Sequence, residues 1–294
     1  MTNRFVSQLA AAAVLIAALA CADDFAEPEG NPEPFATMVG AGDIAACGET
    51  AHEATAQVLD TIPGTVFTTG DNAYPDGTAQ QFADCYEPTW GRHKGRTRPS
   101  PGNHDYHTPG GAAYFAYFGT NAGDPSRGYY SYDLGDWHVI VLNSNIDIGT
   151  NSPQLLWLRG DFAAHSTLCA VAYWHHPRFS SGQHGSDDSI QPIWDALFEA
   201  GVDVVLNGHD HNYERFAPQT PTGAPDAARG IREFVVGTGG KTLRGFGGVA
   251  ANSEIRNSDT YGVLKLTLRS TDYDWDFIPG SGQFVDSGTG TCHP

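Results

Sequence analysis

The chain has 294 residues, of which 40% are hydrophobic and 17% charged, and this composition is that of an ordinary globular protein with a buried core. Its 34 Asp and Glu residues outnumber 16 Lys and Arg residues, for a formal net charge of −18, so it repels nucleic acid and anionic lipid at long range. Binding of nucleic acid through a basic surface is therefore excluded. The high content of glycine and proline, without any heptad or short repeat, also excludes helical bundles, coiled coils and solenoids.

The first 20 residues have the pattern of a secretory signal peptide. Arg4 is the only charge before Asp23, and the continuous Ala, Val, Leu and Ile run at 9–20 is too short to span a bilayer. Residues 18–20 fit an ordinary signal-peptidase site, while residues 17–21 also fit a bacterial lipobox that would make Cys21 a lipid anchor. An acidic, proline-containing spacer follows at 21–34. We therefore expect an exported protein that is secreted, periplasmic or lipid-anchored to the cell envelope.

From residue 35 onward, short apolar runs alternate with clusters of turn-forming residues. Nine runs are predicted as strands: 35–40, 65–69, 97–101, 137–143, 168–174, 202–207, 231–237, 261–268 and 273–278. Three segments are predicted as helices: 50–60, 152–164 and 190–200. Strands alternate with helices early on, while the last third is mainly strands. We therefore predict one α/β catalytic domain over 35–294, with a large mixed sheet or two stacked sheets.

Five of the predicted strands are followed by side chains that can bind a metal ion. Ligands bind beyond the carboxyl ends of strands in open α/β sheets, so we expect these five loops to converge. Their carboxylates, amide, imidazoles and phenol form a nitrogen and oxygen donor set that suits Fe, Zn or Mn. Seven such groups are more than one ion needs, and they fit two ions bridged by a carboxylate. The candidates are Asp43, Asp71, Tyr74, Asn103, His175, His209 and His211.

Four motifs in chain order carry a resemblance to a known family. They are Gly-Asp-x-x-Tyr at 70–74, Gly-Asn-His-Asp at 102–105, His-x-Pro at 175–177 and Gly-His-x-His-x-Tyr-Glu-Arg at 208–215. The chain thereby resembles the calcineurin-like metallophosphoesterases and, within them, the purple acid phosphatases in a compact, single-domain bacterial form. Two motifs depart from the family pattern: the usual Asp-x-Gly is Asp43-Ile44-Ala45 here, and Ala172 replaces the usual Val three residues before His175. The resemblance implies an α/β, metallophosphoesterase-type four-layer fold, in which two stacked mixed β-sheets are flanked by helices.

The resemblance also implies how the seven candidates divide between two metal ions. The first ion would be bound by Asp43, Tyr74 and His211, and the second by Asn103, His175 and His209. Asp71 would bridge them. A phenolate ligand from Tyr74 is typical of Fe(III), which would give the purple colour of the family, and the second ion would be Zn, Mn or Fe.

Four further residues are candidates for catalysis. The resemblance implies that His104 assists the departing alcohol and that Asp105 orients the His104 ring. It also implies that His184, in a loop rich in Gly and Ser, holds a phosphoryl oxygen. His176 is a lesser candidate, because a histidine next to a ligand is more often a supporting or surface residue.

The resemblance as a whole predicts an exported, binuclear phosphoesterase that hydrolyses phosphate monoesters of small substrates. Attack on phosphorus would be in line, by a hydroxide bound to the metal ions. One alternative is a phosphodiesterase that acts on nucleotide or lipid diesters. Another is a catalytically silent module that keeps the metal ions for structure.

Four cysteines remain when Cys21 is set aside, enough for two disulfides in an oxidising compartment. The preferred pairs are Cys47 with Cys85, which would fasten the first two metal loops together, and Cys169 with Cys292, which would tie the C-terminus to a central strand. The sequence alone does not choose among the three connectivities.

Two other charged features have open interpretations. The basic run at 92–98 either steers an anionic substrate or is a solvated loop. Glu214 and Arg215 are predicted to form a structural pair behind the second histidine loop.

Overall fold

The computed structural model describes residues 1–2, 35–165 and 167–293. The predicted signal peptide, apart from its first two residues, and the predicted spacer with Cys21 lie outside the described residues. Each helix in the described part of the chain is too short or too polar to cross a membrane.

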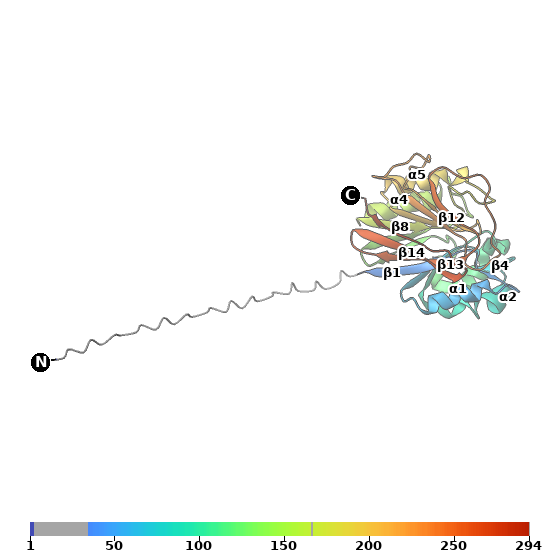
Figure 1. Cartoon of the computed structure of the whole chain (residues 1–294). Coiled ribbons are helices and arrows are strands. Elements are labelled where there is room, and N and C mark those ends of the chain that lie inside the picture. The colour runs from blue at the N-terminus through green and yellow to red at the C-terminus, as the bar shows by residue number, and fades with distance from the viewer. Residues whose placement is uncertain (3–34, 166, 294) are drawn as a thin grey trace. The chain divides into compact units, whose positions relative to one another are not determined.

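Two mixed sheets form the centre of the fold (Figure 1). The first has the order β15-β14-β13-β1-β3-β5, and the second has the order β12-β10-β11-β9-β8-β7-β6. The strands of the first are β1 (Ala36–Ala41), β3 (Thr65–Thr69), β5 (Thr97–Ser100), β13 (Tyr261–Leu268), β14 (Asp272–Ser281) and β15 (Asp286–Thr291). Those of the second are β6 (Tyr130–Leu134), β7 (Trp137–Val141), β8 (Cys169–Tyr173), β9 (Val204–Asn207), β10 (Tyr213–Phe216), β11 (Arg232–Val236) and β12 (Ser253–Asn257). The short strands β2 (Ala45–Ala46) and β4 (Ala73–Tyr74) pair with each other.

The core lies between the two sheets, where side chains from both form one buried cluster that includes Phe67, Tyr173 and Phe234. A second cluster joins the other face of the second sheet to α4 (Pro153–Ala164) and α5 (Gln191–Glu199) through residues such as Leu158 and Trp194. Helix α1 (Ala51–Asp60) packs on β13 and β14 of the first sheet (Figure 1). Burial of apolar surface in these layers supplies the main driving force for the fold. The predicted four-layer fold class is thereby confirmed.

The shorter helical segments lie between β4 and β6 and before α5. They are α2 (Ala79–Gln81), η1 (Phe82–Tyr86), η2 (Trp90–Arg96), η3 (Asp105–His107), η4 (Pro109–Gly111), α3 (Ala112–Phe118), η5 (Gly119–Ala122) and η6 (Asp188–Ile190). None of these was predicted, because each is too short to show a helical period.

All nine predicted strands and three predicted helices are present, and 65–69 and 261–268 match β3 and β13 residue for residue. The sequence did not indicate β15, whose residues alternate with glycine and lack an apolar face. A Cβ atom at Gly288 would lie 2.3 Å from the Trp275 ring, and one at Gly290 would lie 2.3 Å from the Tyr273 ring. These glycines therefore let the edge strand lie flat on two aromatic side chains.

Parallel pairing brings the functional loops to one edge of the fold. Strands β1, β3 and β5 are mutually parallel, as are β7, β8, β9 and β11. The ends of β1 and β11 are joined across the two sheets, because Gly42 N–H donates to the Val236 carbonyl at 2.8 Å and Gly239 N–H donates to the Gly42 carbonyl at 2.9 Å. Loops after strands in different sheets therefore meet at a common site.

Two predictions about charged side chains are resolved by the contacts. The basic run is used within the fold, since Arg92 bonds to Glu53 and Asp60 of α1. Arg96 donates to three backbone carbonyls near the end of that helix.

The predicted Glu214 and Arg215 pair is wrong, because adjacent strand residues point to opposite faces of the sheet. Glu214 accepts hydrogen bonds from Ser181 and Ser253, whereas Arg215 pairs with Asp286 and Glu254.

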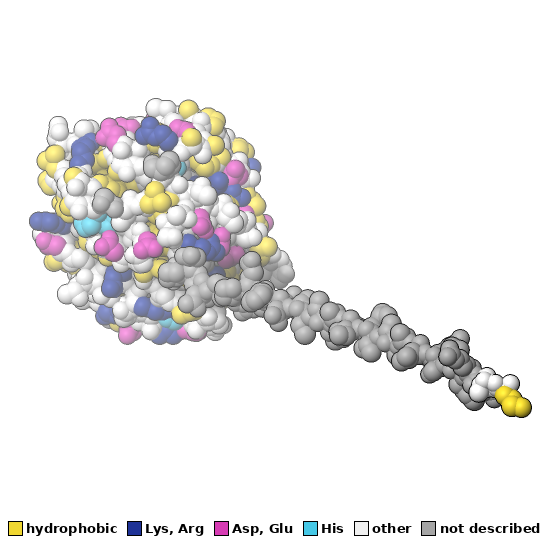
Figure 2. Space-filling model, turned by 90° about the vertical axis from the view of Figure 1, so that its left-hand side faces the viewer, with side chains coloured by type: hydrophobic (Ala, Val, Ile, Leu, Met, Phe, Trp, Pro, Cys, Tyr) yellow, Lys and Arg dark blue, Asp and Glu magenta, His cyan; other side chains and the backbone are white. Residues whose placement is uncertain are grey.

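Acidic and basic side chains are interspersed on the face of the molecule that Figure 2 draws, where Asp and Glu lie among Lys and Arg instead of forming one continuous patch. The net charge of −18 is therefore not gathered into a single acidic surface on that face.

Both preferred disulfides are present. Cys47 is bonded to Cys85 with a Cα–Cα distance of 5.2 Å, and Cys169 is bonded to Cys292 with a Cα–Cα distance of 5.3 Å. The first bond ties the loop after Asp43 to η1, and the second ties the C-terminal residues to the start of β8.

The Cys169–Cys292 disulfide closes a loop of 123 residues, so it restricts the unfolded chain strongly. We predict that Cys169→Ser/Cys292→Ser loses about 2–5 kcal/mol of stability. Thermal unfolding followed by circular dichroism checks this. Metal content should stay unchanged, because Cys169 lies at the opposite end of β8 from His175. An unchanged melting temperature would contradict the prediction.

Candidate metal centre

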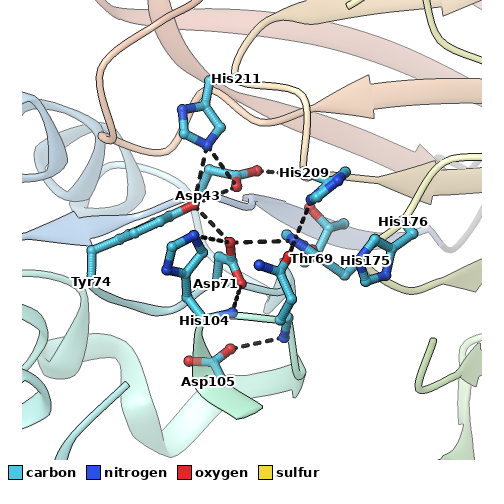
Figure 3. A network of polar contacts seen from close by, with 12 residues as sticks. Asp43, Thr69, Asp71, Tyr74, His104, Asp105, His175, His176, His209 and His211 are labelled. Carbon is cyan, nitrogen blue, oxygen red and sulfur yellow. Dashed lines mark hydrogen bonds and ion pairs between the residues drawn. The ribbon is translucent and has the colours of Figure 1, made fainter. Parts of the chain in front are cut away.

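The structure brings all seven predicted ligands together at the joined ends of the two sheets (Figure 3). They come from the loops after β1, β3, β5, β8 and β9. Asp43, Asp71 and His175 are almost completely buried, with side chains 2% exposed or less, and Tyr74 and His211 are only slightly more accessible. The loops predicted to converge do so.

One cluster of donor atoms surrounds the Tyr74 hydroxyl. The Tyr74 Oη atom lies 2.7 Å from Asp43 Oδ1, 2.8 Å from Asp71 Oδ2 and 3.2 Å from His211 Nε2. Two carboxylate oxygens, a phenol and an imidazole nitrogen thus converge on one small volume.

A second cluster surrounds His175 Nε2. This atom lies 2.9 Å from Asn103 Oδ1, 3.2 Å from His209 Nδ1 and 3.3 Å from Asp71 Oδ2. Asp71 Oδ2 therefore belongs to both clusters, and this is the geometry expected of a carboxylate that bridges two ions.

Strained backbone places these side chains. Asp43, Asp71 and His209 have φ angles of 58°, 52° and 70°, in the left-handed region that non-glycine residues seldom adopt. Such strain costs roughly 1–3 kcal/mol per residue and gathers at functional sites. The neighbouring Gly102 is also required, because a Cβ atom there would lie 2.1 Å from Asp71 Oδ1.

Backbone carbonyls orient two of the histidines. His175 Nδ1 donates to the Thr69 carbonyl at 2.8 Å, and His211 Nδ1 donates to the Thr242 carbonyl at 2.9 Å. In both rings the Nε2 atom faces the clusters, where it would supply a lone pair to a metal ion. A histidine held in this way is the usual form of a metal ligand, because the second hydrogen bond fixes both the tautomer and the ring plane.

The charges of the site also favour cations. No Lys or Arg of the described residues forms an ion pair with Asp43 or Asp71, although both carboxylates are buried. Burial raises the pKa of Asp43. Burial also acts to raise the pKa of Asp71, but the charge and hydrogen bond of His175 outweigh it and hold that pKa below its usual value. Burial acts to lower the pKa of His175, but the charges of Asp71 and Asp43 and the hydrogen bond to Asp71 outweigh this effect and raise the pKa to about 9. Two buried carboxylates that rely on imidazoles for compensation fit a site for metal cations.

His104 lies beside the first cluster. Its Nδ1 donates to the Pro75 carbonyl at 2.5 Å, and its Nε2 faces inward, 3.8 Å from Asp71 Oδ2. The ring also lies on Tyr74, with 4.4 Å between ring centroids. The His104 side chain is 28% exposed, so a ligand can reach it.

Asp105 has a different role from the predicted one. Its carboxylate accepts hydrogen bonds from the backbone N–H groups of Asn72 and Gly102 and from the Asn72 side chain, and it is the Pro75 carbonyl that holds the His104 ring. Burial, followed by the charge of Asp71, raises the pKa of Asp105 to about 7. Asp105 thus joins the two loops that carry Asp71 and Asn103, and the prediction that it orients His104 is wrong.

The remaining two histidines flank His209. The His184 ring centroid lies 4.1 Å from that of His209, and the His176 ring centroid lies 4.5 Å from it. His176 Nδ1 lies 2.7 Å from Ser144 Oγ, and burial, followed by the charge of His175, lowers the pKa of His176 to about 3. His176 therefore supports the His209 ring as a neutral side chain.

Several residues that hold the site in place were not predicted from the sequence. Thr69 and Thr242 act through their backbone carbonyls, which no side-chain motif reveals. Asn72 lies inside the Gly-Asp-x-x-Tyr motif, so its place there was an available signal. Arg244, whose Nη1 donates to His184 Nε2 at 2.9 Å, lies outside every motif.

Part of the chain is similar to known proteins. A family model described as calcineurin-like phosphoesterase matches residues 36–213. Purple acid phosphatase 22 of Arabidopsis thaliana is 35% identical over 103 residues, which are 33% of this chain and 24% of that protein. Purple acid phosphatase 18 of the same plant is 33% identical over 100 residues, which are 32% and 23% of the two chains. The matched region thus spans about a quarter of the length of these relatives.

Two solved structures share the fold. The purple acid phosphatase from yellow lupin (Lupinus luteus) seeds has a TM-score of 0.69 at 19% identity, covering 87% of this chain and 54% of that chain. The anchor in the inner membrane complex of Plasmodium has a TM-score of 0.68 at 15% identity, covering 88% and 89%. At these identities the likeness concerns the fold alone.

The shared position of Asp71 predicts unequal effects of ligand removal. We expect Asp71→Ala to lose both metal ions, so that its metal content falls from about two ions per chain to about none. His211→Ala should lose one ion and keep about one. Mass spectrometry of the metals in the purified, folded variants checks this. Equal metal content in the two variants would contradict a bridging Asp71.

Proposed function

Since the chain belongs to the calcineurin-like phosphoesterase family, we propose that it is a metal-dependent phosphoric ester hydrolase that contains a dinuclear centre. The observation that carries this proposal is the sharing of Asp71 Oδ2 between two clusters of buried donor atoms. The first ion would be held by Asp43, Tyr74 and His211, and the second by Asn103, His175 and His209, with Asp71 between them.

The proposed reaction is hydrolysis of phosphate monoesters of small molecules. Two metal ions held by these residues would supply positive charge for the phosphoryl oxygens and would activate a water for in-line attack. The residues around them hold the ester and exclude other orientations. Asp105 and the glycine turns keep the loops rigid, so that the donor atoms are preorganised for charge that develops during the reaction.

His104 is the proposed proton donor to the departing alcohol oxygen. Its Nδ1 atom is occupied by the Pro75 carbonyl, so the proton that is transferred resides on Nε2, the atom that faces the clusters. An accessible imidazole next to a buried site suits this role, because the alcohol must leave toward solvent.

Export to an oxidising compartment is proposed from the two disulfides, which persist where thiols are not kept reduced. The predicted signal peptide supports the same location. A lipid anchor at Cys21 and free secretion or periplasmic residence are the alternatives, and mass measurement of the processed N-terminus separates them.

The proposed function is tested by hydrolysis of an aryl phosphate monoester and of the matching diester by the metal-loaded chain, with and without a chelator. Hydrolysis of the monoester that the chelator abolishes is the expected result. A preference for the diester would instead favour a phosphodiesterase. No turnover of either ester by a chain that holds two ions would favour a catalytically silent metal-binding module.

We predict that His104→Ala lowers kcat for the monoester about 100-fold or more, in the range of general acid catalysis, while metal content is retained. The matched control is His165→Ala, because this exposed histidine follows α4 and pairs with Asp161, before β8 and away from the loops that carry the candidate ligands. Steady-state kinetics and metal analysis of both variants check the prediction. A parallel loss of metal in His104→Ala would make the residue structural.

The first ion is proposed to be Fe(III), bound by the Tyr74 phenolate, with Zn, Mn or Fe as its partner. Burial and the nearby Asp43 raise the pKa of Tyr74 well above its usual value, so only a strongly charged ion would deprotonate it. We predict a broad visible absorption band that is lost in Tyr74→Phe. A colourless, active protein with two ions would contradict Fe(III) at this position.

A further inference from the structure

The loop after β11 forms one wall of the site, although no sequence motif marks it. Lys241 N–H donates to the Asp43 carbonyl at 2.8 Å, and Arg244 N–H donates to the His211 carbonyl at 2.9 Å. The Thr242 carbonyl between them accepts the His211 Nδ1 hydrogen bond. The loop is thus attached at three points to loops that carry candidate ligands of the first cluster.

The two cations of this loop have different partners. Lys241 forms an ion pair with Glu49 at 2.5 Å, so its charge is compensated within the protein. Arg244 forms no ion pair with a carboxylate of the described residues, and its Nη1 atom donates to a neutral acceptor, His184 Nε2. Elsewhere in the chain, Arg92 and Arg215 are each held by two carboxylates. Arg244 thus keeps a charge that is available for an external anion.

His184 fixes where this charge lies. Its backbone N–H donates to Asp210 Oδ1 at 2.9 Å, and its ring lies on that of His209, a candidate ligand of the second cluster. The guanidinium bonds to His184 Nε2, so it lies one histidine ring away from His209 and thus beside the second cluster. It is half-buried and is followed by glycines, of which Gly245 and Gly248 are exposed.

The direction of the Arg244 hydrogen bond limits what His184 can do. A guanidinium has donors only, so the His184 Nε2 atom must accept. While it accepts from Arg244, this nitrogen cannot donate to a phosphoryl oxygen, which is the role that sequence analysis gave to His184. The guanidinium has further N–H groups that can donate to a phosphate oxygen.

We propose that Arg244 binds non-bridging oxygens of the scissile phosphate and that His184 is its positioning residue. This inference rests on the proposed phosphoesterase function and concerns its substrate class. A guanidinium fork matches two phosphate oxygens, and a monoester dianion offers one more free oxygen and one more charge than a diester. Arg244 therefore favours monoesters over diesters.

Calorimetric titration of the metal-loaded, full chain with inorganic phosphate tests the proposal without requiring turnover. Arg244→Gln should weaken phosphate binding at least about tenfold, as expected when a hydrogen bond to a charged group is lost. Arg244→Lys should recover part of the affinity, because it restores the charge without the fork.

The matched control is Arg229→Gln, an exposed arginine in the segment before β11, at the opposite end of that strand. All variants must hold the same metal content as the parent chain, and loss of metal in both Arg244 variants would overturn the proposal in favour of a structural role.

A double variant separates binding from positioning. If His184 acts through Arg244, His184→Leu/Arg244→Gln should bind phosphate no more weakly than Arg244→Gln alone. Losses that add in the double variant would show that His184 binds phosphate independently, and unchanged affinity in Arg244→Gln would overturn the proposal.

Kinetics with the two aryl esters then test the substrate class. Arg244→Gln should lower kcat/KM for the monoester several-fold more than kcat/KM for the diester. An equal decrease for both esters would overturn the assignment of monoester preference. If the parent chain hydrolyses neither ester, the proposed function fails, whereas the phosphate titration still decides whether Arg244 binds an oxyanion.

Discussion

The site depends on a single carboxylate oxygen, Asp71 Oδ2, which lies in contact with Tyr74 on one side and His175 on the other. A buried carboxylate without a Lys or Arg partner costs free energy unless cations or hydrogen-bond donors compensate it. The other oxygen of Asp71 accepts the His104 N–H bond at 2.8 Å, so the side chain is fixed at both ends. The strained turns and the hydrogen bonds that orient the histidines place the other candidate ligand atoms around this carboxylate.

The stacking of two sheets explains how so many donors reach one place. The first sheet supplies Asp43, Asp71 and Asn103 from consecutive parallel strands, and the second supplies His175 and His209. Oxygen donors therefore come mainly from one sheet and imidazoles from the other. The interface between the sheets is a large apolar core, which resists relative movement and so keeps the two donor sets in register. Preorganisation of the site is in this sense a property of the core packing.

Much of this arrangement could be predicted because it rests on local patterns. Apolar runs followed by Gly-Asp or Gly-His located the strands and the ligands, and the family resemblance divided the ligands between two clusters in the way that the distances now group them. What escaped prediction depends on contacts distant in the sequence. Asp105 bonds to Asn72 and not to its neighbour His104, because the turn between β5 and η3 directs the carboxylate under the preceding loop. The edge strand β15 was missed because its stability comes from aromatic rings of β14 and not from its own side chains.

Arg244 is a residue of the functional site that could not be predicted from the sequence for the same reason. Its residue type and its surroundings in the sequence, between Leu243 and a run of glycines, are those of an ordinary surface loop. Only the fold reveals that the cations of the chain differ in availability, since Lys241 is neutralised by Glu49 and Arg92 of the basic run pairs with Glu53 and Asp60 of α1. In a chain with a net charge of −18, an anionic substrate is repelled at long range. Under the proposed function, binding would therefore come from short-range interactions with the two metal ions, His104 and Arg244.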